Sequence, residues 1–292
     1  MASTEVEHLA FALRALTLWA DPADVTVIDN ASRPEVSAAI TELIERHRMR
    51  RMRLHDLEDG SNTTPYLHEG IIRLCREHPD ETILKVDEDV LFATDPARIR
   101  VGPRELWVPN VTVNQLTSKF YAQALWPELY EQIKDNEQPW HLPGPDGVDR
   151  KVELMERFYA TPPETLAEVC DRDPRIERIG RREWKRCRLV GGYRREKRGV
   201  SIMALGFRAQ DYLDAIGDKQ GVDEVLLANA VWRRKLRYVV DRGVYCHHVN
   251  YWSIRPQIQA MGDEVARYNE RVLELLRSRL TSGAAAPARA AR

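Results

Sequence analysis

Residues 82–92 read Thr-Ile-Leu-Lys-Val-Asp-Glu-Asp-Val-Leu-Phe, and this stretch decides the prediction of the fold. The β-branched and apolar residues 82–86 predict a strand that carries Asp87, Glu88 and Asp89 at its carboxyl end. Three neighbouring carboxylates repel one another, and the apolar residues on both sides indicate that they are partly desolvated. A divalent cation such as Mg²⁺ or Mn²⁺ would neutralise them, because both ions accept carboxylate oxygens. An acidic turn that ends a strand is the alternative interpretation.

Two strand–helix units precede this strand in the sequence. Residues 25–28 are β-branched and apolar, Asp29 follows them, and residues 35–46 carry apolar side chains at helical spacing. A weaker strand at 52–57 and a helix at 65–77 repeat the pattern. Such alternation predicts an α/β fold with a central, mostly parallel sheet and helices on both faces, where ligands bind beyond the carboxyl ends of the strands.

The remainder of the chain is less regular. It contains a candidate strand at 107–113, a Pro- and Gly-rich loop at 139–149, a β-hairpin at 189–193 and 200–207, and helices at 223–239 and 257–280. We predict that residues 1–115 and 116–281 form two halves of one domain. The tail at 282–292 is of low complexity and is predicted to be disordered.

The composition limits the classes of function. The 292 residues carry 44 Lys and Arg against 45 Asp and Glu, so the formal net charge of -1 gives no general attraction to nucleic acid or to an anionic membrane. The four cysteines are widely separated, which favours reduced thiols over a disulfide framework. No apolar run reaches the roughly 20 residues of a membrane helix, and no signal peptide is visible. We therefore expect a cytoplasmic protein without a membrane span.

Three motifs in sequence order resemble those of the GT-A fold glycosyltransferases, especially family 2. They are Val-Thr-Val-Ile-Asp-Asn-Ala-Ser at 25–32, the stretch 60–70, and Lys-Val-Asp-Glu-Asp at 85–89. The resemblance covers roughly the first third of the chain and starts at the helix that follows the family's usual first strand. It implies a sandwich in which residues 1–115 bind a nucleotide sugar and residues 116–281 bind the acceptor and close over the donor.

The resemblance also implies roles for single residues. In that family the aspartate after the second strand contacts the nucleoside, which here implies Asp29, with Asn30 beside it. The D-x-D pair implies that Asp87, next to Lys85, lies near the ribose and that Asp89 binds the metal that bridges the donor diphosphate.

A second acidic pair, Asp223 and Glu224, precedes an apolar helical run. Carboxylates at a helix N-terminus are favoured by the helix dipole, so ordinary capping explains the pair without catalysis. The resemblance implies more, because inverting members of the family carry an acidic pair in this setting, and one of its acids deprotonates the acceptor hydroxyl. The choice between Asp223 and Glu224 stays open.

Two adjacent histidines, His247 and His248, follow the predicted acid-bearing helix. Neutral imidazole is a good ligand for a transition metal such as Mn²⁺. Neighbouring side chains of an extended segment point to opposite faces, so only one of the two histidines is expected to reach the metal, with a slight preference for His247.

Together these features predict a glycosyltransferase that uses Mn²⁺ or Mg²⁺, a nucleoside-diphosphate sugar donor and an unidentified acceptor. A sugar nucleotidyltransferase is a second possibility, although the glycine-rich phosphate loop usual for that class is not visible. A non-catalytic module that binds RNA or a partner through the arginine runs 46–53 and 194–198 is a third. We interpret these runs mainly as solvated faces and do not expect a nucleic-acid partner.

Overall fold

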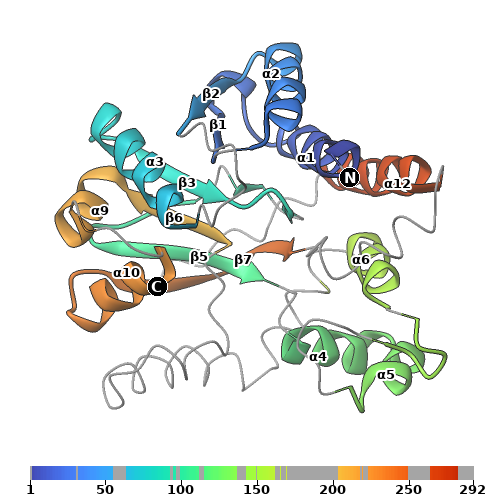
Figure 1. Cartoon of the computed structure of the whole chain (residues 1–292). Coiled ribbons are helices and arrows are strands. Elements are labelled where there is room, and N and C mark those ends of the chain that lie inside the picture. The colour runs from blue at the N-terminus through green and yellow to red at the C-terminus, as the bar shows by residue number, and fades with distance from the viewer. Residues whose placement is uncertain are drawn as a thin grey trace. The chain divides into compact units, whose positions relative to one another are not determined.

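The computed structural model describes residues 2–30, 32–54, 64–92, 95–96, 99–111, 115–136, 143–148, 150–161, 165, 169, 203–217, 219, 223–248 and 264–281. These residues form a mixed α/β protein (Figure 1). Two compact units are present: residues 1–88, 97–108 and 180–240 form the first, and residues 89–96, 109–179 and 241–292 form the second. The chain leaves the first unit and enters the second between Glu88 and Asp89, inside the acidic triplet.

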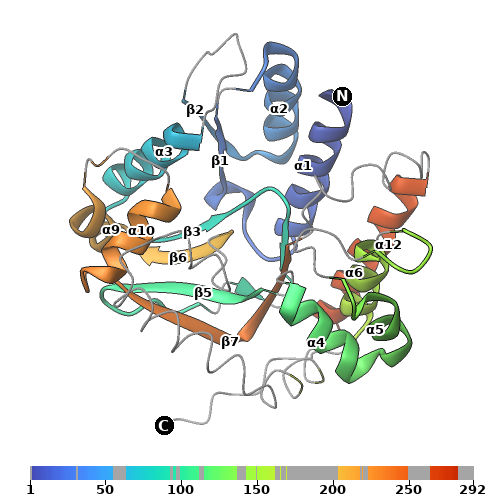
Figure 2. The same cartoon turned by 60° about the horizontal axis from the view of Figure 1, so that its bottom comes forward.

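The first unit begins with two helices and a parallel strand pair. Its elements are α1 (Ala2–Leu16), the 3-10 helix η1 (Pro22–Asp24), β1 (Thr26–Asp29), α2 (Pro34–His47) and β2 (Arg50–Arg53). β1 and β2 pair in parallel, and α2 lies beside them (Figures 1 and 2). Because the apolar residues of α2 recur every three or four positions, they share one buried face, which packs with Leu13 of α1. The strand predicted at 25–28 and the helix predicted at 35–46 are confirmed to within a residue or two at each end.

Three helices of the first unit share one core. α3 (Thr64–Glu77) confirms the helix predicted at 65–77 and leads to β3 (Thr82–Val86). It packs with α9 (Ala209–Ile216) and α10 (Asp223–Trp232), and Figure 2 shows the three helices grouped beside β3. Their buried apolar side chains include Ile71, Ile72, Cys75, Tyr212, Ala215, Leu227 and Val231. Burying such side chains contributes roughly 1.5–3 kcal/mol for each large one, so this core holds the unit together.

Helix α3 also approaches the β1–β2 pair very closely, at Gly70. A Cβ at this position would lie 3.1 Å from Cγ2 of Ile28 and 3.2 Å from the methyl carbons of Leu54. These distances are shorter than ordinary van der Waals contacts between carbons, so the glycine allows α3 to pack against the strand pair.

The main sheet has five strands in the order β3-β6-β5-β7-β4. Its other strands are β4 (Val90–Phe92), β5 (Glu105–Val111), β6 (Ala204–Arg208) and β7 (Arg237–His248). β6 is antiparallel to both β3 and β5, and β4 is antiparallel to β7. The prediction of a mostly parallel sheet is therefore wrong for these strand pairs. Among the described residues, parallel pairing with a defined register occurs between β1 and β2, which form a two-stranded sheet of their own. Local sequence patterns predict strands but do not reveal which distant strand will be the partner.

The later elements differ from the prediction in one important respect. The helix predicted at 223–239 ends at Trp232, and β7 begins at Arg237. Arg234, with φ 57°, lies in the turn between them and reverses the chain in the left-handed region. The strand predicted at 107–113 is β5, and β6 overlaps the second predicted hairpin strand, whereas the first hairpin strand at 189–193 falls in a part of the chain that the structure does not describe.

The second unit contains α4 (Gln115–Leu125), α5 (Pro127–Ile133), α6 (Lys151–Ala160) and α12 (Glu264–Thr281). Buried residues of α4, α5 and α6 form a small core of Ala122, Leu129, Ile133 and Leu154. α12 packs on α6, where Arg271 Nε lies 2.7 Å from Glu156 Oε1. The predicted tail at 282–292 is not among the described residues. Within the described parts of the chain, no helix combines the length and apolar character that crossing a bilayer requires.

Two of the four cysteines can be placed. Cys75 is a free thiol in the core, as the sequence predicted, and Cys246 is also fully buried. Burial disfavours the thiolate and raises the pKa of Cys75 to about 12, and it raises the pKa of Cys246 as well. Both thiols are therefore suited to packing rather than to nucleophilic chemistry.

Arg104 joins two turns at one edge of the first unit. Its Nε donates to the carbonyl oxygen of Lys235 at 3.0 Å, and its Nη2 donates to the carbonyl oxygen of Arg234. Its backbone N–H donates to Asp211 Oδ2 at 2.7 Å, and its own carbonyl accepts the N–H of Arg237 at 2.8 Å. The side chain thus satisfies carbonyls in the turn that follows α10.

We expect Arg104→Ala to lower the free energy of unfolding by about 1–2 kcal/mol, because its two side-chain hydrogen bonds are lost while the alanine keeps the Cβ that is strained at a φ of 56°. Arg104→Gly removes the same side chain but tolerates this φ, so it should unfold at higher denaturant concentration than the alanine variant. Urea titration of both variants measures the difference. Arg233→Ala, at an exposed neighbouring position, is the control and should change stability by less than about 0.5 kcal/mol.

Candidate functional site

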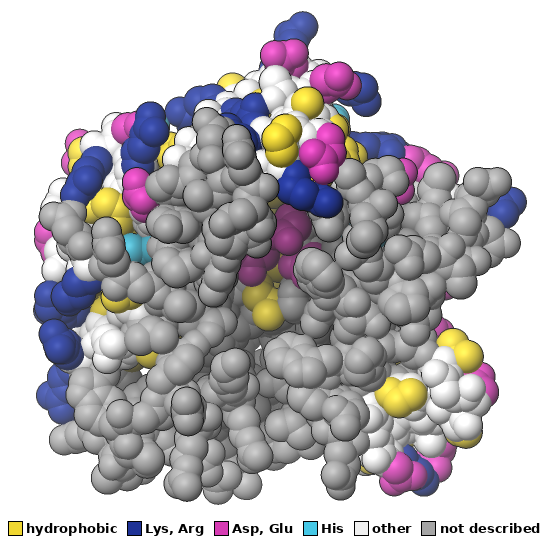
Figure 3. Space-filling model, in the orientation of Figure 1, with side chains coloured by type: hydrophobic (Ala, Val, Ile, Leu, Met, Phe, Trp, Pro, Cys, Tyr) yellow, Lys and Arg dark blue, Asp and Glu magenta, His cyan; other side chains and the backbone are white. Residues whose placement is uncertain are grey.

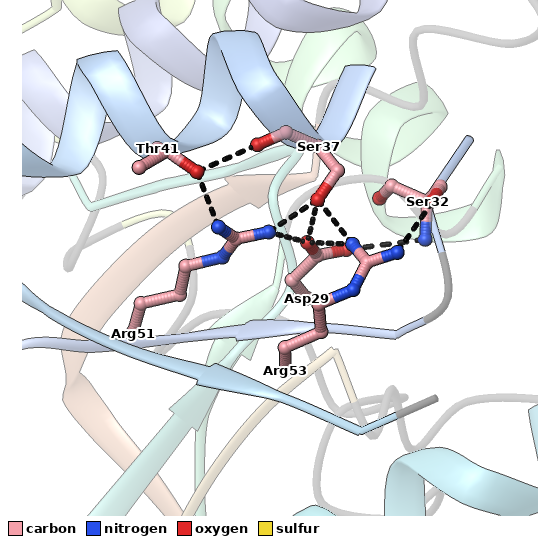
Figure 4. Close-up of polar contacts among 6 residues, drawn as sticks. All are labelled: Asp29, Ser32, Ser37, Thr41, Arg51 and Arg53. Carbon is pink, nitrogen blue, oxygen red and sulfur yellow. Dashed lines mark hydrogen bonds and ion pairs between the residues drawn. The ribbon is translucent and has the colours of Figure 1, made fainter. Parts of the chain in front are cut away.

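The carboxylate of Asp29, at the end of β1, is the centre of a buried polar network (Figure 4). Its Oδ1 accepts the backbone N–H of Ser32 at 3.1 Å, and its Oδ2 accepts the hydroxyl of Ser37 at 3.0 Å. Arg53 Nη1 lies 2.8 Å from Oδ2, and Arg51 Nη2 also donates to this oxygen. The side chain of Asp29 is 0% exposed, so these four donors surround a carboxylate that bulk water does not reach.

The strand register explains why two arginines meet this aspartate. Parallel pairing places Arg53 opposite Asp29 and Arg51 opposite Val27, and residues two apart on a strand point to the same face. Ser37 lies in the first turn of α2 and bonds to both guanidinium groups, while Thr41, one turn later, accepts from Arg51. Three elements, β1, α2 and β2, are thereby joined through one carboxylate.

The electrostatics of the network keep Asp29 ionised. Burial alone raises the pKa of this carboxyl, but hydrogen bonds from Ser32, Arg51 and Ser37 outweigh burial and lower the pKa from 3.8 to about 2. One carboxylate faces two guanidinium groups, so the end of β1 and β2 carries excess positive charge.

These contacts change the interpretation of the arginine run 46–53. Arg46, Arg48 and Arg50 are exposed, as predicted for a solvated face. For Arg51 and Arg53 that interpretation is wrong, because their side chains are only 22% and 26% exposed and pair with Asp29. The alternation Arg-x-Arg in a strand that follows an aspartate-ended strand was the available signal.

The network also bears on the predicted nucleoside contact. Asp29 has no exposed side-chain surface in this arrangement, so a nucleoside that bonded to it would have to replace one of its present donors. Its neighbour Asn30 is partly exposed at the same strand end. The donor-binding roles of Asp29 and Asn30 stay predictions.

Asp87 is held in place at the end of β3. Lys85 Nζ lies 2.5 Å from Asp87 Oδ1, and the backbone N–H of Asp87 donates to the carbonyl oxygen of Met203 at 2.8 Å. The Lys85 side chain is 9% exposed and that of Asp87 is 29% exposed, so the pair is partly shielded from water. An ion pair in such a setting orients a carboxylate more firmly than one on the open surface.

Asp89 directly precedes β4, and the pairing of β4 with β7 brings it close in register to the two histidines. Val90 is opposite His248, and Leu91 is opposite His247. Asp89 is therefore one residue from a position paired with a histidine, although more than 150 residues separate them in sequence. Asp89 is partly exposed, and the side chains of His247 and His248 are not among those described.

The remaining predicted site residues, Asp223 and Glu224, are the first two residues of α10. Their placement at a helix N-terminus is as predicted, but their side chains are outside the described set. Among the residues that are described, no three His, Cys, Asp or Glu side chains are grouped so that they could hold a metal ion. This leaves the metal site involving His247 and His248 as a prediction.

The comparisons with known proteins add no further constraint. No protein-family model, curated protein or solved structure matches this chain.

Proposed function

We propose that this protein is a metal-dependent glycosyltransferase that moves a sugar from a nucleoside-diphosphate sugar to an acceptor hydroxyl. The observation that carries the proposal is the β4–β7 register, which brings Asp89 into the neighbourhood of His247 and His248. The fixed carboxylate of Asp87 at the end of β3 is consistent with a contact to the donor ribose.

The chemistry of this donor set suits Mn²⁺ better than Mg²⁺. A carboxylate from Asp89 and one imidazole from His247 or His248 offer mixed oxygen and nitrogen ligands, which Mn²⁺ accepts, whereas Mg²⁺ prefers oxygen and water alone. A metal bound there would act as a Lewis acid and stabilise negative charge on the departing nucleoside diphosphate.

In an inverting reaction, a carboxylate of the protein itself removes the proton from the acceptor hydroxyl. The acceptor oxygen forms its bond to the anomeric carbon while the bond from that carbon to the diphosphate oxygen breaks. Glu224 or Asp223 takes the proton that the acceptor hydroxyl loses. In a retaining reaction neither acid is needed as this base.

A screen of nucleotide sugars with Mn²⁺ tests the proposal. A donor present at about 100 times its Kd should stabilise the folded protein by about 2.7 kcal/mol, which raises Tm by several degrees. The same donor should be hydrolysed slowly to nucleoside diphosphate, and EDTA should abolish both effects. Failure of every donor class to bind or turn over with Mn²⁺ or Mg²⁺ would contradict the proposal. Release of pyrophosphate from a nucleoside triphosphate and a sugar phosphate would instead identify a nucleotidyltransferase.

A further inference from the structure

The turn between α10 and β7 carries a cluster of positively charged side chains. Residues 233–237 read Arg-Arg-Lys-Leu-Arg, and all of them except the buried Leu236 are exposed. Arg104, in the turn before β5, is also exposed and bonds to this turn through its Nε and Nη2. The five cations of this region all belong to the first unit and are called the turn patch below: Arg104, Arg233, Arg234, Lys235 and Arg237.

The backbone of this turn is a helix C-cap of the Schellman type. The N–H of Lys235 donates to the carbonyl oxygen of Ala230 at 2.9 Å, and the N–H of Arg234 donates to that of Val231 at 2.9 Å. Arg234 has a left-handed φ of 57°, at the position where such caps usually carry glycine. These bonds hold the turn in one conformation at the end of α10.

Arginine occupies positions here that glycine would occupy with less strain. Among the described parts of the chain, the non-glycine residues with a positive φ are Arg48, Arg104 and Arg234. The side chain of Arg104 bonds to two carbonyls, whereas that of Arg234 makes neither a hydrogen bond nor an ion pair with the described residues. Backbone strain at a residue without an internal role points to a role outside the chain.

The carboxylates around the turn patch do not neutralise it. Glu105 pairs with Arg237, and Asp211 Oδ2 accepts a backbone N–H at 2.7 Å. Asp214 Oδ1 accepts Nε2 of Gln210, also at 2.7 Å. Five cations therefore face three carboxylates, and the patch keeps an excess of positive charge although the whole chain carries a formal net charge of -1.

Four of the five cations keep their charge available. Arg233, like Arg234, makes neither a hydrogen bond nor an ion pair with the described residues. The side chains of Arg104 and Lys235 contact carbonyl oxygens, which carry no full charge that would cancel theirs. In Figure 3, dark-blue side chains stand at the outer edge of the first unit, on the side where Figure 1 shows α9 and α10.

We propose that the turn patch docks the first unit reversibly on an anionic membrane surface, where it binds the phosphate groups of acidic lipids. Cations at an outer edge can reach a flat surface together, and guanidinium groups bind phosphate oxygens in pairs. Each cation near an anionic bilayer adds to the attraction, which acts over about a Debye length, so the local charge matters more than the net charge. The large apolar side chain that is exposed among the described residues is Val148, in the second unit, so the patch contacts headgroups without an apolar anchor.

This inference is independent of the transferase activity, because the turn patch contains none of the proposed donor, metal or catalytic residues. Sedimentation of the full chain with lipid vesicles tests it without a sugar donor. Vesicles of phosphatidylcholine with phosphatidylglycerol should bind the wild type, and vesicles of phosphatidylcholine alone should not. The bound fraction should fall as the salt concentration rises, because the contact is electrostatic.

The decisive variant is Arg233→Gln/Arg234→Gln, which leaves Arg104 and Lys235 to hold the turn. Its affinity for the anionic vesicles should fall about thirtyfold, since each cation near such a surface contributes about a factor of five. Both positions are exposed, and glutamine at position 234 meets the same φ as arginine, so folding should be preserved. Circular dichroism verifies this.

The matched control is Arg46→Gln/Arg48→Gln, which removes two exposed arginines at the end of α2 in the same unit. Arg48 also has a φ of 57°, so the control matches both the charge and the backbone of the turn variant. Figure 1 shows α2 well apart from α10, and the affinity of the control should stay within about twofold of the wild type.

Three results would overturn the proposal. The wild type could fail to bind anionic vesicles, the folded turn variant could bind as tightly as the wild type, or the control could weaken binding as much as the turn variant does. A DNA duplex is tested in parallel. Salt-sensitive binding to the duplex by a protein that ignores the vesicles would identify a nucleic-acid partner instead.

Discussion

Replacement of Asp89 by asparagine is expected to lower metal-dependent turnover of the nucleotide-sugar donor by at least about a hundredfold. Asparagine keeps the size of the side chain but removes the charge that attracts a divalent cation. The remaining activity should need a higher Mn²⁺ concentration, because the variant retains only the histidine side of the proposed ligand set. Initial rates measured over a series of Mn²⁺ concentrations, with the donor found by the screen, give both quantities.

The control for this experiment is Asp135→Asn, which neutralises an exposed aspartate at the end of α5 in the same unit. It should leave the rate and its Mn²⁺ dependence unchanged. Unchanged turnover in Asp89→Asn would rule out the proposed metal site. If the protein were instead a non-catalytic binding module, Asp89→Asn would keep its affinity for the partner and no donor would be consumed.

The second large effect is expected on stability. Asp29→Asn should lower the free energy of unfolding at neutral pH by on the order of 2 kcal/mol, as the difference between a pKa of 3.8 and one of about 2 implies. The variant leaves Arg51 and Arg53, each about one quarter exposed, without their carboxylate partner. Chemical denaturation measures the change. Asp24→Asn, at an exposed position in η1, is the control and should be nearly neutral.

The same pair of proteins gives a pH dependence with a defined sign. The pKa of Asp29 is lower in the folded chain, so its contribution is complete above about pH 4 to 5 and is lost as the pH falls towards 2. The stability difference between wild type and Asp29→Asn should therefore be constant from pH 5 to 7 and shrink below pH 4. A difference that persisted undiminished at pH 2 would show that the network stabilises the fold through packing rather than charge.

The sequence predicted local structure better than it predicted strand pairing. The strand before Asp29, the helix over α2 and the strand before Asp87 follow from short-range hydrophobic periodicity, which directly reflects burial on one face. The antiparallel pairing of β6 with β3 joins residues more than 100 positions apart, and no local pattern encodes it. The end of α10 at Trp232 was missed because the apolar residues Val239 and Val240 continue a plausible helical pattern across a turn.

For the site, the sequence identified carboxylates but not their partners. Asp29, Asp87 and Asp89 all lie at or next to strand ends, as predicted. The arginines that engage Asp29 come from the next strand, and their position depends on the parallel register rather than on any motif. Arginine side chains are mostly exposed in folded proteins, so the sequence alone predicted that Arg51 and Arg53 would be exposed to solvent.

The arginine-rich edge of β2 has a consequence for association between copies of the chain. A strand edge with unsatisfied backbone groups can template the addition of another strand, which is a common start of aggregation. The sequence Arg-Arg-Met-Arg gives this edge a high density of like charge, so a second copy of β2 approaching it would be repelled. The arginines of β2 would therefore oppose strand addition of this kind at high protein concentration.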